Sequence, residues 1–184
     1  PAMVRPNGDG TWASVETWDQ NGLQAYYKSG YQGMDGEDLV TLPPGLRMIA
    51  GDAHATSAPD ARFFLFECII NPSTDTTTTD KVGQTIPDCD DGEVLRMKIV
   101  FPQCWDGVNL DSPNHKDHMA YGQWRANRTD PGGCPPSHPV AIPEITQNFL
   151  YPVGEDGSGD WRLVTDPDGQ PDGWTAPADW GHGW

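Results

Sequence analysis

The chain has 184 residues, enough for one domain with a hydrophobic core, and we expect a single domain spanning residues 1–184. Hydrophobic residues make up only 36% of it, while 21 glycines and 18 prolines disfavour long helices, because both residue types destabilise a helix interior. The formal charge of −16 repels phosphate backbones and argues against nucleic acid as a partner, and no apolar run is long enough to span a membrane.

Alternating polar and apolar residues predict strands in the first third of the chain. Residues 12–18 alternate with period two, and residues 23–28 can return as a partner strand. Asn21-Gly22 between them is a strong hairpin-turn signal, so we predict a β-hairpin. Residues 46–50 (LRMIA) are predicted to form a further, buried strand.

The most apolar runs lie in the middle of the chain. Residues 62–70 (RFFLFECII) are rich in aromatic and β-branched residues, which predicts a central strand buried on both faces. Residues 71–87 are polar and include four consecutive threonines, so a solvent-facing loop is expected. In residues 93–101 every second position is apolar (Leu95, Met97, Ile99, Phe101), which predicts a strand with one face against the core.

Three shorter strands are predicted after residue 139. Residues 140–143 suggest an edge strand, residues 146–151 a core strand and residues 161–164 another strand. The chain shows no internal repeat and no long helical period. We therefore predict an all-β fold, a single-domain, jelly-roll-like β-sandwich with long loops.

The chain has four cysteines, Cys68, Cys89, Cys104 and Cys134, and none of them forms a C-x-x-C pair of the zinc-ribbon kind. Four cysteines allow three pairings. We predict the sequential one, Cys68 with Cys89 and Cys104 with Cys134, because each pair closes a loop of middling length. Two disulfides point to an oxidising compartment, so we expect the protein to be extracellular.

Residues 104–121 (CWDGVNLDSPNHKDHMAY), called the polar loop below, have almost no apolar filling and carry most of the candidate site residues. A neutral histidine can act as a general base, a general acid or a metal ligand. Asp106 and Asp111 could instead divide the acid and base roles at a glycosidic bond. The H-x-x-H spacing of His115 and His118 is not the H-E-x-x-H of zinc proteases. The alternative is a loop whose Asp, Asn and Ser side chains cap its own backbone.

The second half of the polar loop is predicted to contain one short helical turn over residues 114–119. Pro113 suits the start of such a turn, and Asp111 or Ser112 could cap it. His115 and His118 would then share a face. Because the chain becomes apolar again at Met119, we expect His118 to be the more buried ring and the ligand or base, and His115 to contact substrate.

Further candidates come from the surroundings of the polar loop. A Cys104–Cys134 disulfide would draw His138 towards it, so His138 joins Asp106, Asp111, His115 and His118 as a candidate catalytic residue. Sugar rings stack on exposed indoles, which suggests a substrate-binding role for the flanking tryptophans, although core packing is the alternative for Trp105. The candidate substrate-binding residues are Asn109, Asn114, Trp105 and Trp124. The same donors could hold a divalent cation.

Three stretches, residues 42–51 (LPPGLRMIAG), 101–121 (FPQCWDGVNLDSPNHKDHMAY) and 134–142 (CPPSHPVAI), resemble a secreted fungal and bacterial domain of unknown function. Domains of this family often accompany carbohydrate-binding WSC modules, so the resemblance implies an extracellular or wall-associated protein with polysaccharide as its partner. Family members also carry histidine motifs beyond both ends of this chain. The resemblance therefore implies a chain truncated at both ends relative to the full family domain.

We accordingly expect an extracellular protein that acts on cell-wall or environmental polysaccharide as a hydrolase, with acid, base or ligand groups in the polar loop. The alternative is a non-catalytic module that binds carbohydrate or has a structural role at the cell surface.

Overall fold

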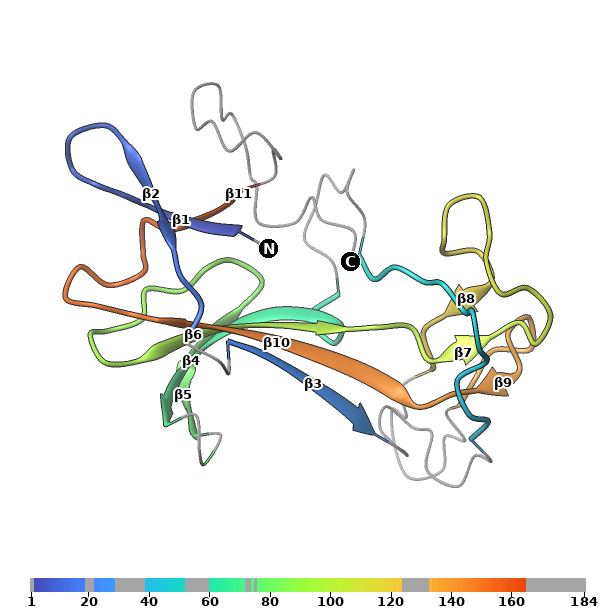
Figure 1. Ribbon diagram of the computed structural model, residues 1–184. Helices are drawn as coiled ribbons and strands as arrows, with labels where there is room; N and C mark the ends of the chain where they lie inside the picture. Colours follow the sequence, from blue (N-terminus) through green and yellow to red (C-terminus); the bar gives the residue numbers. More distant parts are fainter. Residues whose placement is uncertain are drawn as a thin grey trace. The chain divides into compact units, whose positions relative to one another are not determined.

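The computed structural model describes residues 2–18, 22–28, 39–51, 60–71, 74, 76–123 and 133–164, and every regular element in these ranges is a β-strand (Figure 1). The strands are β1 (Ala2–Pro6), β2 (Trp12–Val15), β3 (Leu23–Lys28), β4 (Phe64–Asn71), β5 (Thr76–Gly83), β6 (Val94–Val100), β7 (Cys104–Trp105), β8 (Met119–Ala120), β9 (Val140–Ala141), β10 (Glu144–Pro152) and β11 (Arg162–Val164). No helix capable of crossing a membrane occurs in the described ranges.

The strands form three sheets, with the orders β11-β1-β2, β3-β10-β6-β4-β5 and β8-β7-β9. Strand β4 is antiparallel to β5 and β6, β1 is antiparallel to β2 and β11, and β7 is antiparallel to β8 and β9. Antiparallel sheets of this kind are the layers from which β-sandwiches are built. The predicted fold class, all-β with two disulfides, is confirmed.

The described residues divide into two compact units. Unit 1 draws them from residues 1–24, 51–99 and 148–183, and unit 2 from residues 25–50 and 100–147. Unit 1 contains the sheet β11-β1-β2 and strands β4 and β5, whereas unit 2 contains the sheet β8-β7-β9.

The core of unit 1 is built on β4 and β6, which pair directly. The predicted apolar face of β6 is confirmed, because Leu95, Met97 and Ile99 are fully buried, and each such side chain contributes about 1.5–3 kcal/mol relative to an exposed one. Phe64 and Phe66 on β4 pack edge to face, with ring centroids 5.2 Å apart. The prediction of a buried strand at residues 62–70 is confirmed, although Ile70 is exposed at its end.

A buried ion pair joins the same two strands. Glu67 and Arg96 are cross-strand partners, and Arg96 Nε donates a hydrogen bond of 2.8 Å to Glu67 Oε1. Lys98 Nζ lies 3.8 Å from the same oxygen. Because the Glu67 and Arg96 side chains are each more than 90% buried, removing Arg96 would leave the Glu67 charge poorly compensated in a region of low polarity.

Both predicted disulfides are present, Cys68–Cys89 in unit 1 and Cys104–Cys134 in unit 2. The first closes a loop of 21 residues and the second a loop of 30 residues.

The predicted hairpin over residues 12–28 is wrong. Strand β2 pairs with β1, with Met3 opposite Val15, and β3 lies beside β10 in the five-stranded sheet. The Asn-Gly signal is local, and Asn21 itself lies outside the described residues. Burial of Met3 and Val4 in β1, a strand that was not predicted, outweighs that local preference.

The predicted loop at residues 71–87 is also partly wrong, because Thr76–Gly83 forms β5, an edge strand of the five-stranded sheet. Threonine is β-branched and favours strands, a preference that its polarity concealed. The register of β5 against β4 shifts twice, between Glu67 and Ile69 and between Ile69 and Asn71.

Residues 46–50 form no strand, contrary to prediction, although Ala50 is buried as expected. Their backbone hydrogen bonds are made to the polar loop and not to a strand. Arg47 N–H donates to Leu110 O at 2.9 Å, and Ile49 N–H donates to His115 O at 3.2 Å. This extended segment therefore lies against the polar loop, within unit 2.

Candidate functional site

The two ends of the polar loop form the paired strands β7 and β8 of unit 2. Cys104 lies opposite Ala120 and Trp105 opposite Met119 in the β7–β8 pair. The Asp106 N–H extends this pairing by donating to His118 O at 3.0 Å. The two ends of the loop are therefore held side by side, which restricts the residues between them.

Asp106 caps the first turn of the loop. Its Oδ1 accepts hydrogen bonds from Val108 N–H (2.8 Å) and Asn109 N–H (2.9 Å), and its Oδ2 accepts one from Asn109 Nδ2 (2.7 Å). Burial alone would raise the pKa of Asp106, but these hydrogen bonds outweigh it and lower the pKa below its usual value. Asp106 is thus an ionised cap at neutral pH.

The predicted helical turn at residues 114–119 is wrong, and two successive tight turns take its place. His115 N–H donates to Ser112 O and Met119 N–H to Lys116 O, each at 2.8 Å. Asn114 Oδ1 accepts from the N–H groups of Lys116 and Asp117, so a side chain satisfies donors that a helix would have used. Asn114, like Asp106, caps the loop's own backbone.

His118 is the more buried histidine, as predicted, with 1% of its surface exposed. Its Nε2–H donates to Arg47 O, because a carbonyl oxygen can only accept, and its Nδ1 lies 2.9 Å from Ser112 Oγ. Both ring nitrogens therefore have partners. A catalytic or ligand role for His118 would require one of these bonds to break.

His115 is oriented differently, with 47% of its side chain exposed. Its Nδ1–H donates to Asp111 Oδ1 at 2.5 Å, and Nε2 has no partner among the described residues. The hydrogen bond from His115 is the main cause that lowers the pKa of Asp111, so this carboxylate is ionised at neutral pH. An aspartate that fixes the tautomer of a histidine leaves a lone pair on the other nitrogen.

Arg47 completes this group, although no sequence pattern predicted a role for it. Its Nη1 lies 3.7 Å from Asp111 Oδ2, so Asp111 lies between a guanidinium and an imidazole. The contact follows from the backbone bonds that hold residues 46–50 on the polar loop. Arg47 falls in one of the three stretches that carry the family resemblance, which was the available signal. Asp111, His115 and Arg47 are called the Asp–His–Arg group below.

The backbone at His115 is left-handed, with φ of 55°. Such a conformation is uncommon for a residue other than glycine, and non-glycine residues in it cluster at functional sites. The His115 ring is bonded to Asp111 and the His118 ring to Ser112 and Arg47, so the two rings have different partners.

His138 approaches the polar loop, as the Cys104–Cys134 disulfide led us to predict. Its Nε2–H donates to Asp117 O at 3.0 Å, and its Nδ1 lies 2.9 Å from Ser137 Oγ. The ring contacts the backbone of the loop, and none of its described hydrogen bonds goes to Asp106, Asp111, His115 or His118.

The candidate substrate-binding residues are only partly described. Trp105 is half-buried, and its Nε1–H donates to Asn109 O at 2.6 Å, so the indole supports the first turn of the loop. The side chains of Asn109 and Asn114 are exposed and bonded to Asp106 and Asp117 respectively. Trp124 lies outside the described residues.

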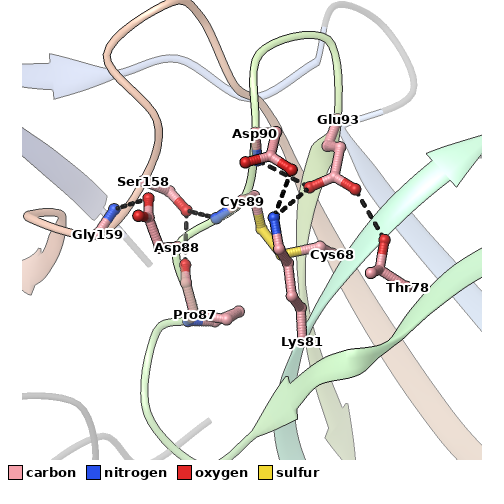
Figure 2. Close-up of polar contacts among 10 residues, drawn as sticks. All are labelled: Cys68, Thr78, Lys81, Pro87, Asp88, Cys89, Asp90, Glu93, Ser158 and Gly159. Carbon is pink, nitrogen blue, oxygen red and sulfur yellow. Dashed lines mark hydrogen bonds and ion pairs between the residues drawn. A yellow bond between two sulfur atoms is a disulfide. The ribbon is translucent and has the colours of Figure 1, made fainter.

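A second polar cluster lies beside the Cys68–Cys89 disulfide in unit 1 (Figure 2). Glu93 accepts hydrogen bonds from Thr78 Oγ1 (2.7 Å) and Asp90 N–H (2.8 Å), and Lys81 Nζ lies 3.4 Å from it. Within the described ranges, Cys68, Cys89 and Glu93 are the one group close enough to hold a metal ion. Their two sulfurs form the disulfide and are not thiolate ligands, so the cluster is structural.

Comparison with known proteins gives a family and no nearer relative. A family model described as a domain of unknown function (DUF1996) matches residues 1–184. Neither the curated proteins nor the solved structures contain a match.

Proposed function

We propose that this chain, which belongs to the DUF1996 family, acts outside the cell on polysaccharide as a hydrolase, with the Asp–His–Arg group as its reactive centre. The observation that carries the proposal is the exposed His115 ring, whose Nδ1 is held by Asp111 while Nε2 remains without a partner among the described residues. The two disulfides support an oxidising, extracellular location.

The group has the parts of a general base. His115 Nε2 would take a proton from a water molecule, and the resulting hydroxide would attack the substrate. Asp111 would stabilise the imidazolium that forms, as a carboxylate does in other histidine dyads. Arg47, which carries a fixed positive charge beside Asp111, would stabilise negative charge that develops on the substrate.

The electrostatics favour an ester linkage over a glycosidic one. Cleavage by two carboxyl groups needs one of them protonated, with a raised pKa, whereas the pKa values of Asp106 and Asp111 are both lowered. Ester hydrolysis needs a single dyad, because the imidazolium can return its proton to the leaving sugar oxygen when the tetrahedral intermediate collapses. Ester substituents of a polysaccharide are therefore the proposed substrate.

A non-catalytic carbohydrate-binding module is the second candidate, and a specific observation favours it. Asp106, Asn114 and His118 all have their hydrogen-bonding atoms engaged in holding the polar loop together. A loop made rigid in this way presents a fixed polar surface, which suits recognition as well as catalysis.

Release of acetate and of reducing sugar from a panel of acetylated wall polysaccharides tests the proposal. We expect the wild type to release acetate, and His115→Gln to lose about 10²-fold or more of that activity, the range typical of a general base. Val108→Ala, an exposed change in the same loop, is the matched control and should keep full activity. Depletion of the protein from solution by a polysaccharide without any product would refute the hydrolase and support the binding module.

A further inference from the structure

Unit 1 contains a pocket of about 440 Å³ whose lining residues all belong to that unit. It is lined by Arg5 of β1, residues 14–16 at the end of β2, Pro152 at the end of β10, and residues 154–157 and Trp161 after β10. Pockets that bind small molecules usually measure about 300–1,000 Å³. The volume therefore suits a ligand of one or two sugar rings.

The charged groups around the pocket are mostly negative. Arg5 Nη1 lies 3.5 Å from Asp156 Oδ2, but both side chains are well exposed, at 45% and 89%, so this pair is weak. Glu16 and Glu155 have no ion-pair partner among the described residues. Three carboxylates against one guanidinium leave a local excess of negative charge that a cationic ligand would neutralise.

The lining of the pocket also includes apolar residues. Trp161 is only 4% exposed and therefore held firmly in place, and Val15 and Pro152 add apolar surface. An inorganic cation would make no favourable contact with these apolar side chains. A ligand that carries both a positive charge and C–H faces would contact the apolar lining residues and the carboxylates together.

The loop that carries Glu155 and Asp156 continues into Ser158 and Gly159, whose hydrogen bonds to residues 87–89 are drawn in Figure 2. Ser158 is fully buried; its Oγ donates to Pro87 O at 2.6 Å and accepts from Cys89 N–H at 2.8 Å. Gly159 N–H donates to Asp88 Oδ1 at 3.0 Å. Because Cys89 is bonded to Cys68 of β4, this loop is tied to the core, and a pre-ordered wall lowers the entropy lost on binding.

We propose that this pocket binds an amine-bearing sugar unit of a deacetylated polysaccharide, with the protonated amine between Glu16 and Glu155. The polysaccharide partner rests on the proposed function, but the site shares no residue with the Asp–His–Arg group and needs no catalysis. The formal charge of −16 on the chain would also attract a polycationic polymer over a distance.

Calorimetric titration of the full chain with three β-1,4-linked tetrasaccharides tests the proposal. They are the tetramer of glucosamine, the tetramer of N-acetylglucosamine and the tetramer of glucose. We expect heat of binding with the glucosamine tetramer alone. Glu16→Gln and Glu155→Gln should each weaken its affinity roughly two- to fivefold, as expected for exposed charge pairs. Asp160→Asn removes a carboxylate from the same loop, outside the pocket lining, and is the matched control that should bind like the wild type.

Salt supplies a second readout, because the Debye length falls from about 30 Å at 0.01 M to about 8 Å at 0.15 M ionic strength. Affinity for the glucosamine tetramer should fall over that range in the wild type and less in the Glu16→Gln/Glu155→Gln double variant. Equal binding of all three tetramers, no binding, or equal weakening by Asp160→Asn would overturn the proposal. If the protein releases acetate from acetylated polysaccharide but shows no heat of binding with the glucosamine tetramer, the proposed pocket ligand is refuted and the proposed hydrolase is not. If it binds the tetramer but releases no product from polysaccharide, the hydrolase is refuted and the pocket ligand is not.

Discussion

His118 Nε2 lies 2.5 Å from the carbonyl oxygen of Arg47, and this hydrogen bond joins two segments that are 71 residues apart in the chain. The donor is buried within the polar loop, and the acceptor belongs to the extended segment that brings the Arg47 guanidinium to Asp111. The bond positions the Asp–His–Arg group although neither of its two atoms would take part in the proposed chemistry.

Replacement of His118 by alanine should therefore lower stability as well as activity. The change leaves the Arg47 carbonyl oxygen without its His118 partner, whereas the Ser112 hydroxyl keeps Asn114 and Lys116 as partners. A buried group left unsatisfied costs about 1–3 kcal/mol. Urea unfolding followed by tryptophan fluorescence measures the effect. His115→Ala, which removes an exposed ring, is the comparison and should unfold near the wild-type midpoint. Equal midpoints for wild type and His118→Ala would show that the bond does not hold the loop.

Asp106 should make the polar loop sensitive to acid. Its pKa is lower in the folded chain than the value of about 3.9 expected when unfolded, so its contribution is present above that value and is lost as the pH falls through the folded pKa. Asp106→Asn should be less stable than wild type near neutral pH. The difference should shrink as the pH falls below about 3.9 and through the folded pKa, because the wild-type carboxylate then becomes protonated. Unfolding midpoints across this pH range check it, and a constant difference would contradict the assignment.

The Cys104–Cys134 disulfide should contribute about 3–4 kcal/mol to the free energy of unfolding, by the chain-entropy relation for a loop of 30 residues. The double change Cys104→Ser/Cys134→Ser removes it without leaving a free thiol. The similar loop of 21 residues closed by Cys68–Cys89 predicts a nearly equal loss for its own double variant. Denaturant titration of both variants makes the comparison. A loss confined to one pair would mean that native packing, and not loop closure, sets the effect.

Gly157→Ala should disturb the pocket wall, because the residue has φ of 67° and an added Cβ would lie 2.7 Å from Asp88 Oδ1. The left-handed backbone alone costs a non-glycine residue about 1–2 kcal/mol. Gly154→Ala, whose Cβ would meet no atom within 4 Å, is the matched control. Thermal unfolding should show a lower melting temperature for the first variant alone. A melting temperature shared by both variants would be evidence against a tightly anchored loop.

Sequence patterns predicted best where burial and local preference agree. In residues 93–101 every second position from Leu95 to Phe101 is apolar, and β6 lies in the middle of the largest sheet. The disulfide pairing and the deep burial of His118 were also predictable from spacing and from the neighbouring Met119. In each case a short stretch of sequence contained the physical cause.

The errors have the opposite origin, because they depend on partners distant in the chain. Residues 46–50 have the composition of a strand, but their hydrogen bonds go to Leu110 and His115, which local periodicity cannot show. The hairpin failed because β1 was not recognised as the competing partner of β2. Within the polar loop, residue types indicated a site, but only the fold separates the capping carboxylate of Asp106 from the Asp111 that orients a histidine.

The two register shifts of β5 affect the tendency of the protein to associate with other chains through this sheet edge. An exposed edge strand offers unpaired N–H and C=O groups to which another chain can add, which is a common start of aggregation. Each shift interrupts the regular spacing of those groups and increases the local twist, so a straight foreign strand cannot match β5 over its length. Irregular pairing at this edge would therefore help a β-rich protein with an exposed sheet edge to stay dissolved at high concentration.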